Sequence, residues 1–344
     1  MQRVLAALFG AALVLSGCAH YLPGVATIGA SGDEQAAFFE GDPPTYGQQV
    51  SSADEIRLAY LRALRRLDVC GLVNQQSLAR IGEIRLMGTL FAFDECDVEV
   101  KVAGNPWPSV ITATVELAEA QGPEVLREQG IPVLESYPGA CEYLVPLGLS
   151  DVPGASPLAG PEQPYLRVGM ASEFDCDMVR RVASVVAARV ADVPLPVRDG
   201  AAAYTTALAE RDPCEILTAL EGYVIDQWSI SAGTPYRCAF GLGRDRGAAT
   251  MPITVSLRPR VVDISTAGRG LIRVGDVEVY LDRDGCSALV FVGPDLQRRR
   301  GNGALVDTGD LRIRPAVDVA GGQGNCTGQT LVQEVAAAAA DLFR

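Results

Sequence analysis

Histidine and lysine are nearly missing from this chain of 344 residues, in which His20 and Lys101 are the only examples. Catalytic triads and most zinc sites depend on histidine. His20 lies two residues after Cys18, close to the N-terminus, and no two cysteines have CxxC spacing. The sequence therefore gives no support for a histidine-dependent nucleophile, and we expect neither a metal site nor a cofactor.

The sequence also lacks an apolar segment long enough to be predicted as a membrane span. The apolar run from Val4 to Leu15 is shorter than the roughly 20 residues that a span requires. Arg3 precedes this run, and Ser16-Gly17-Cys18 ends it. The order is typical of a lipoprotein signal peptide. We expect residues 1–17 to be removed and Cys18 to be acylated, which would hold the protein on the extracytoplasmic face of the cell membrane.

Positive charge is scarce. Without residues 1–17, which contain Arg3, the chain has 28 basic against 42 acidic residues, and its net charge is 28 − 42 = −14. Such a surface repels nucleic acids and anionic lipid head groups. We therefore exclude a nucleic-acid partner. We expect contact with the membrane through the lipid anchor, and an unidentified envelope ligand or protein as the partner.

The residues that are present follow one pattern twice. Ala59-Tyr60 end ten residues before Cys70, and Ala203-Tyr204 end ten residues before Cys214. Successive cysteines are separated by 26, 45 and 35 positions in the first copy and by 24, 48 and 40 positions in the second. Four matching cysteines in the same order indicate an internal duplication.

The duplication sets the expected domain boundaries. We predict a flexible tether at 18–50, a first module at 51–191, a short linker at 192–200 and a second module at 201–344, which copies the order of elements in the first. Because the linker is short and each module has four cysteines, we expect residues 201–344 to fold alone when oxidised.

Eight cysteines remain besides Cys18, an even number that suits an oxidising compartment. If each module is self-contained, three pairings are open within it. We favour joining first to second and third to fourth, because such bridges connect predicted helices to predicted strands, whose Cα atoms can approach within about 7 Å. The other pairings stay open. The favoured bridges are Cys70–Cys96, Cys141–Cys176, Cys214–Cys238 and Cys286–Cys326.

Hydrophobic periodicity predicts the elements of each module. A capping box at Ser52 to Glu55 opens a helix, and another helix follows Cys176. Alternation predicts strands such as Val98 to Val102 and Ile111 to Leu117, while Pro123 to Gly130 fits a short helix. The predicted fold class is α+β, with two tandem repeats of a disulfide-clasped antiparallel sheet and helices packed on one face.

Carboxylates are the candidates for acid/base chemistry. Asp94 and Asp97, within the acidic stretch 94–99, would serve a hydrolase. The same stretch alternates acidic with apolar residues, which is typical of the solvent-facing side of a strand. A second acidic motif at 282–285 resembles the start of a calcium loop, but the later ligands are absent.

The candidate binding residues are basic or aromatic. Arg298, Arg299 and Arg300 interrupt an otherwise acidic surface and suit a phosphate or carboxylate, although a solvated loop tip explains them as well. Trp228 fits either a ligand groove or a partly buried anchor. These four residues form the predicted binding set.

Residues 212–218 read Asp-Pro-Cys-Glu-Ile-Leu-Thr, which resembles the D-P-C-x-L-L-T opening of a family of actinobacterial lipoproteins of unknown function. The lipobox, the cysteine-led helix and the later strand cysteines are also similar to the extracellular sensor domains of mycobacterial PknH-type kinases. In those domains two disulfides clasp helices to an antiparallel sheet with a cleft. The first module departs from the motif at 68–74. The resemblance implies a cell-envelope binding or sensing module and carries over no catalytic residues.

Three functions are therefore compared. The leading hypothesis is an extracytoplasmic ligand- or partner-binding lipoprotein without catalytic activity. The alternatives are a carboxylate-dependent envelope hydrolase and a purely structural surface lipoprotein. Activity screening separates the hydrolase from the other two, and thermal-shift screening with lipids and glycans separates a binding protein from a scaffold.

Overall fold

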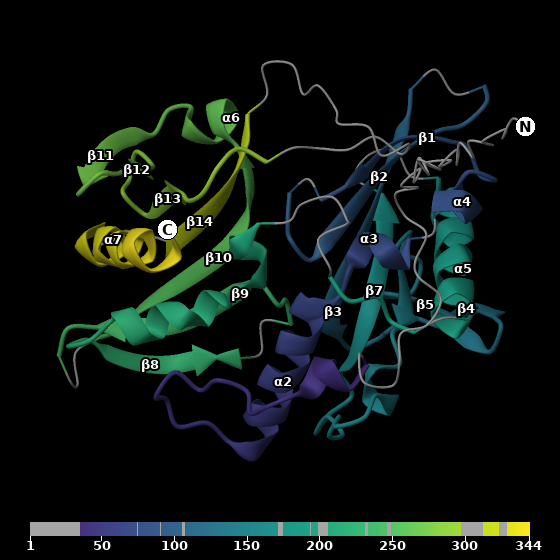
Figure 1. Ribbon diagram of the computed structural model, residues 1–344, viewed down its shortest axis with the longest axis horizontal. Coiled ribbons are helices and arrows are strands. Elements are labelled where there is room, and N and C mark those ends of the chain that lie inside the picture. Colours follow the sequence, from purple (N-terminus) through teal and green to yellow (C-terminus); the bar gives the residue numbers. More distant parts are fainter. Residues whose placement is uncertain are drawn as a thin grey trace, which may run out of the picture.

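The computed structural model of this protein contains two seven-stranded antiparallel sheets, one in each half of the chain (Figure 1). One sheet is built within residues 83–170 and the other within 224–321. The predicted fold class of tandem α+β repeats is confirmed. The structure describes residues 35–73, 75–89, 91–104, 107–170, 175–192, 194–198, 206–230, 233–245, 249–296, 312–322 and 329–344.

The first unit combines one sheet with helices and short 3₁₀ turns, the latter labelled η. Its strands are β1 (Glu83–Gly88), β2 (Glu95–Lys101), β3 (Ser109–Ala118), β4 (Glu124–Glu128), β5 (Ile131–Glu135), β6 (Tyr143–Pro146) and β7 (Gln163–Met170). Its helical elements are η1 (Ala37–Phe39), α2 (Ser52–Arg66), α3 (Val69–Leu72), α4 (Gln75–Leu78), η2 (Leu149–Asp151) and α5 (Cys176–Asp192).

The second unit has the same number of strands. They are β8 (Val224–Ser229), β9 (Arg237–Gly243), β10 (Met251–Val261), β11 (Gly270–Val274), β12 (Val277–Leu281), β13 (Ser287–Phe291) and β14 (Ile313–Gly321). Its helical elements are η3 (Ala207–Glu210), η4 (Pro213–Ala219), α6 (Val262–Thr266) and α7 (Gln329–Phe343).

The two sheets have one topology. The first sheet has the order β1-β2-β3-β7-β6-β5-β4, and the second, read from β8, has the order β8-β9-β10-β14-β13-β12-β11. Numbered within its own unit, each sheet is therefore 1-2-3-7-6-5-4. Register agrees as well, since Cys96 lies opposite Ala113 and Cys238 lies opposite Val255. This agreement is what an internal duplication predicts.

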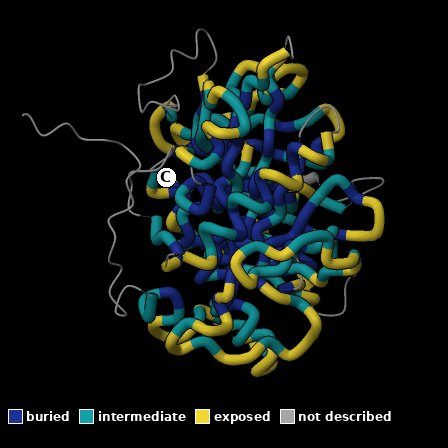
Figure 2. The backbone as a smooth tube through the Cα atoms, turned by 90° about the vertical axis from the view of Figure 1, so that its right-hand side faces the viewer, coloured by how far each residue is buried: buried dark blue, intermediate teal, exposed yellow. Residues whose placement is uncertain are grey.

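The core of each unit lies between its sheet and the helices on one face. In the first unit α2, α3 and α5 cover the sheet, and Leu64, Val98 and Val182 are fully buried between them. In the second unit α7 and η4 cover the sheet, with Val255 and Val335 inside. Buried segments run through the middle of the molecule and exposed residues gather at its outer turns (Figure 2).

Disulfides tie the helical elements to the sheets. Cys286 is disulfide-bonded, while its favoured partner Cys326 and the lipidation candidate Cys18 lie outside the described residues. Three favoured bridges are present, with Cα separations of 5.1, 4.9 and 5.1 Å: Cys70–Cys96, Cys141–Cys176 and Cys214–Cys238.

Two local predictions are wrong. Residues 123–130 form strand β4 and a turn rather than a helix, because Gln129 takes a left-handed φ of 48° that closes a hairpin with β5. Proline near the start and glycine near the end are common both in a short helix and in a strand that leads into a turn. The positions of Pro123 and Gly130 therefore did not distinguish the two. The N-cap of α2 is Ser51 rather than Ser52, since the Ser51 side chain accepts a hydrogen bond from the Asp54 amide at 3.2 Å.

Residues 35–50 are part of the folded body, so the predicted tether does not extend over them. Phe38 is fully buried in the first core. The Tyr46 ring lies 6.2 Å from the ring of Trp228. The expected linker is also fixed over 194–198, where the Arg198 amide donates to the main-chain oxygen of Arg66 at the end of α2.

Residues of each copy enter the other at the junction. Phe93 of the first copy is fully buried in the second core, with its ring 5.5 Å from that of Tyr236. Arg65 and Asp212 form an ion pair whose side chains are only 8% and 10% exposed. These contacts form one folded body, so a fragment starting at residue 201 loses partners that its core and its buried charge require.

Candidate functional site

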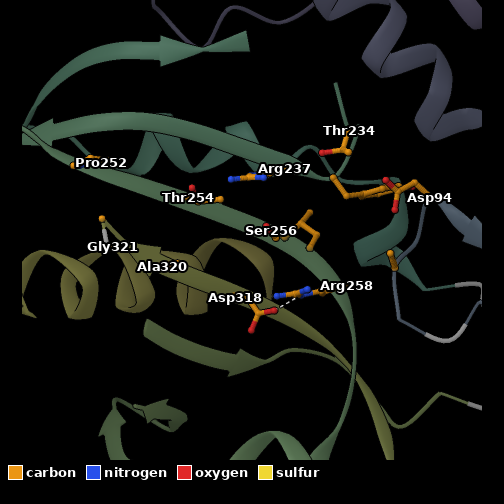
Figure 3. A pocket seen from close by; sticks show the side chains of 14 residues that line it. Asp94, Thr234, Arg237, Pro252, Thr254, Ser256, Arg258, Asp318, Ala320 and Gly321 are labelled. Atoms are coloured by element: carbon orange, nitrogen blue, oxygen red, sulfur yellow. Dashed lines mark hydrogen bonds and ion pairs between the residues drawn. The ribbon is translucent and has the colours of Figure 1, made fainter. Parts of the chain in front are cut away.

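A cavity of about 640 Å³ lies on the face of the second sheet that α7 does not cover (Figure 3). Its wall comes mainly from β10 and β14, with Arg237 from β9, and residues just before β2 of the first copy complete it. The volume is typical of a small-molecule site. The polar residues that line the cavity are Asp94, Thr234, Tyr236, Arg237, Thr254, Ser256, Arg258 and Asp318.

The alternation of β10 puts polar side chains in the cavity. Successive residues of a strand point to opposite faces. Ile253 and Val255 are buried in the core, so Thr254, Ser256 and Arg258 lie on the opposite face. They line the cavity wall, which is therefore held by a long strand paired on both sides.

Asp318 is the fixed charge at the centre of this face. It lies opposite Ser256 on the neighbouring strand β14. Both Arg258 and Arg260 form ion pairs with it, and the Arg260 Nη2 lies 2.8 Å from the Asp318 carboxylate. Two guanidinium groups on one carboxylate leave a net positive charge beside the cavity.

Arg237 adds a further positive charge. It lies opposite Ser256 on the other neighbouring strand, β9, and is exposed. Among the described residues it has no hydrogen-bond or ion-pair partner. Figure 3 shows its side chain on the same face as Thr254 and Ser256. Arg237 therefore offers its donors to the cavity.

Asp94 reaches the cavity from the first copy. Phe93 anchors this segment in the second core, and the Asp94 main-chain oxygen accepts a hydrogen bond from the Val115 amide at 2.9 Å. Burial raises the pKa of Asp94 to about 6. Its backbone hydrogen bond, Arg198 and Arg258 lower the pKa, and Glu116 raises it. The Asp94 carboxyl therefore changes its charge near neutral pH.

The equivalent face of the first sheet has the opposite pattern of charge. Arg237 and Glu95 both precede the strand cysteine and pair with equivalent residues of the next strand. By the same register, Arg258 corresponds to Glu116 and Asp318 to Arg167. All three positions differ in the sign of their charge, so only the second copy has an excess of arginine at these positions.

Two carboxylates on the acidic face of the first sheet, Glu116 and Glu142, are paired with Arg167. Arg167 lies 2.6 Å from Glu116 and 3.0 Å from Glu142 in a continuous ion-pair network. Burial, followed by the charge of Asp97, raises the pKa of Glu95 well above its usual range. Glu116 and Glu142 therefore have a cationic partner within the first copy, whereas the exposed Arg237 has no such partner among the described residues.

The carboxylate prediction is corrected in one respect. Asp94 and Asp97 are 5% and 3% exposed, so they do not form the solvent-facing side of a strand. Asp97 accepts a hydrogen bond from the Thr112 hydroxyl at 3.3 Å and does not line the cavity, whereas Asp94 does. The structure therefore brings one of the two predicted carboxylates to the cavity.

Of the predicted binding set, Trp228 is the residue that the structure describes. Trp228 packs against both cores, and its indole Nε1 donates to Cys214 Sγ at 3.3 Å. It is a partly buried anchor rather than part of the cavity. Arg298, Arg299 and Arg300 lie outside the described residues.

Sequence reasoning missed Arg237, Arg258 and Asp318. The alternating polar residues of β10 were readable as a strand face, and the duplication placed Arg237 directly before Cys238 as it placed Glu95 before Cys96. The charge reversal was therefore visible beside the aligned cysteines. The sheet pairing that adds Asp318 was not readable from spacing.

Comparisons with known proteins assign no function. No family model, curated protein or solved structure matches the chain. Within the described ranges, no helix is long and apolar enough to cross a membrane, and no three His, Cys, Asp or Glu side chains are grouped to hold a metal ion. The geometry of the cavity is therefore the basis for a functional proposal.

Proposed function

We propose that this protein is a lipid-anchored binding protein of the cell envelope, which holds a small ligand in the cavity on its second sheet and performs no catalysis. The observation that carries the proposal is the cavity itself. It has a volume of about 640 Å³ and a wall of paired strands with polar side chains. Sites of this size with a few fixed polar groups are typical of small-molecule binding.

The way the two copies meet supports this function. Phe93 brings Asp94 across the junction, so the cavity needs both copies to be complete. Ion pairs and strand pairing fix the residues at its base, which limits the reorganisation required on binding. The lipoprotein signal ending at Cys18 and the resemblance to envelope sensor domains favour a location outside the cytoplasm.

A carboxylate-dependent hydrolase is the second candidate, because Asp94 lines the cavity and has a pKa of about 6. Acid/base hydrolysis commonly uses two carboxyl groups. The other carboxylate in the cavity, Asp318, is engaged by two arginines, and Asp97 does not line the cavity. A binding role fits this arrangement better than a paired acid and base.

A cavity-filling substitution tests the proposal. Ala320 is exposed, lines the cavity and lies opposite Thr254, so Ala320→Trp fills the space without entering the core. We expect a ligand from an envelope extract to bind the wild-type protein, raise its Tm and be identified by mass spectrometry. Ala320→Trp should fold and lose both effects. Ligand capture that is equal in the two proteins, or missing from both, would reject the proposal and favour a structural lipoprotein.

Activity screening completes the test. With envelope glycans and esters as substrates, we expect no turnover by the wild-type protein. Turnover that disappears in Asp94→Asn while ligand binding persists would instead establish the hydrolase.

A further inference from the structure

We infer that the ligand carries an oxyanion, a phosphate or carboxylate group, which binds beside Arg237 and Arg258. The inference rests on the proposed function and specifies the chemistry of the same cavity. Guanidinium groups bind such oxyanions through charge-assisted and often bidentate hydrogen bonds. The arrangement of positive charge around Ser256 is the basis for choosing this class of ligand over neutral or cationic ones.

Charge around the cavity runs against the charge of the chain. The whole sequence has 29 basic and 42 acidic residues. Ser256, however, has Arg237 opposite it on β9 and Asp318 opposite it on β14. Arg258 and Arg260, on the same strand as Ser256, share the single carboxylate of Asp318. Three guanidinium groups therefore face one permanently engaged carboxylate and Asp94. The positive charge of these guanidinium groups attracts an anion to the cavity, while the acidic surface around it disfavours weaker, non-specific anion binding.

Arg237 is the residue best placed for direct contact. It lines the cavity, is exposed and has no partner among the described residues. Arg258 also lines the cavity, with 38% of its side chain exposed while it pairs with Asp318. Ser256 lies next to both arginines and Thr254 follows it on the same strand face, and the hydroxyls of both can donate further hydrogen bonds.

The net charge of the cavity depends on pH through Asp94. The charged or titratable groups that interact with it are Arg198, Glu116, Arg258 and Glu95, together with the buried Tyr236 that lines the same cavity. Asp94 is neutral below a pKa of about 6 and negative above it. Because a negative carboxylate opposes an anion, oxyanion affinity should rise as pH falls through this range, and Asp94→Asn should flatten the dependence.

The test uses the whole mature chain with Cys18→Ala, which removes the expected lipid attachment. Sulfate, inorganic phosphate and acetate are titrated and followed by amide NMR shifts. We expect saturable binding that Arg237→Gln weakens about tenfold to a hundredfold, the usual effect of losing a hydrogen bond to a charged group. The control is Arg273→Gln on the distant edge strand β11, whose side chain is 70% exposed. It should leave the affinity unchanged.

Vesicles separate the two sources of an oxyanion. Binding to phosphatidylglycerol but not phosphatidylcholine vesicles, lost in both Arg237→Gln and Ala320→Trp, would identify a lipid head group. Binding of soluble anions alone would identify a free metabolite. If none of the anions binds saturably, or if Arg237→Gln and Arg273→Gln behave alike, the inference is overturned. The proposed function then still stands where Ala320→Trp abolishes capture of a neutral ligand from the extract.

For pH dependence, sulfate is the probe because its charge is constant between pH 5 and pH 8. We expect the wild-type affinity to increase toward pH 5 and that of Asp94→Asn to stay level. An equal pH dependence in both proteins would remove Asp94 from the inference.

Discussion

The two copies share strand order and register but differ in the charges on one face. Both sheets have the order 1-2-3-7-6-5-4, and the strand cysteines occupy equivalent positions. On the polar face, three equivalent pairs have opposite signs: Glu95 and Arg237, Glu116 and Arg258, Arg167 and Asp318. Core packing constrains the inward residues of a sheet, whereas a polar face can change without loss of the fold. The same backbone arrangement therefore presents two different polar surfaces.

The copies also differ in their N-terminal helices. The first has the 15-residue helix α2, whereas the second has the turns η3 and η4 before its first strand. Arg65 on α2 then pairs with Asp212, so the first copy supplies support that the second lacks.

The largest expected effect tests this dependence. Asp212→Asn leaves the Arg65 guanidinium buried without its carboxylate and should cost about 3–5 kcal/mol of unfolding free energy. The equivalent Asp68 is half-buried rather than buried, so Asp68→Asn changes a more solvated carboxylate and should cost roughly 1 kcal/mol. Guanidinium unfolding of the oxidised proteins gives both values. Equal losses would show that the two aspartates have equivalent roles.

A double variant provides the control for this comparison. Arg65→Met with Asp212→Asn removes both charges, and it should recover part of the stability lost by Asp212→Asn alone. Additive losses from the two substitutions would argue against an energetic coupling between these residues.

The second expected effect concerns the bridge that both copies share. Cys70–Cys96 closes 26 positions and Cys214–Cys238 closes 24, so the chain-entropy model assigns roughly 3–4 kcal/mol to each. We therefore expect similar losses when each pair is replaced by alanines, measured by thermal unfolding. A clearly larger loss in the second copy would mean that its 3₁₀ turns depend on the bridge more than α2 and α3 do.

The third effect is a difference in pH dependence between equivalent positions. The pKa of Asp94 is about 6 in the folded protein against an ordinary 3.8. Its protonated form therefore stabilises the fold fully below about pH 4, and this contribution of up to about 3 kcal/mol is lost as pH rises through 6. Asp94→Asn should remove that part of the pH dependence between pH 4 and pH 7.

Tyr236 is the matched control, because it precedes Arg237 as Asp94 precedes Glu95. Burial raises the pKa of Tyr236 to about 12, so it does not titrate in this range. Tyr236→Phe should lower stability by a similar amount at each pH, through loss of its hydrogen bond to Ala209. If Asp94→Asn also changes stability equally at every pH, the assigned titration of Asp94 is wrong.

Sequence reasoning succeeded where a pattern repeats and failed where distant segments meet. The cysteine spacing led to the duplicated fold class and to three bridges that the structure contains. Phe93 and Tyr46 carry no local signal of their partners, because their positions depend on how one copy packs against the other. The cavity depends on the same junction, and for that reason Asp94 was found as a carboxylate and Arg237 was missed.

The smallest expected effect concerns α2, the N-terminal helix of the first copy. The Ser51 side chain accepts the Asp54 amide hydrogen bond, whereas Ser52 is the first residue inside α2. Ser51→Ala should therefore lower the unfolding free energy by about 1 kcal/mol, the usual cost of losing an N-cap. Ser52→Ala should change it by less than about 0.5 kcal/mol, because alanine favours helix interiors and Ser52 is exposed. Urea unfolding measures both, and a larger loss for Ser52→Ala would restore the cap predicted from the sequence.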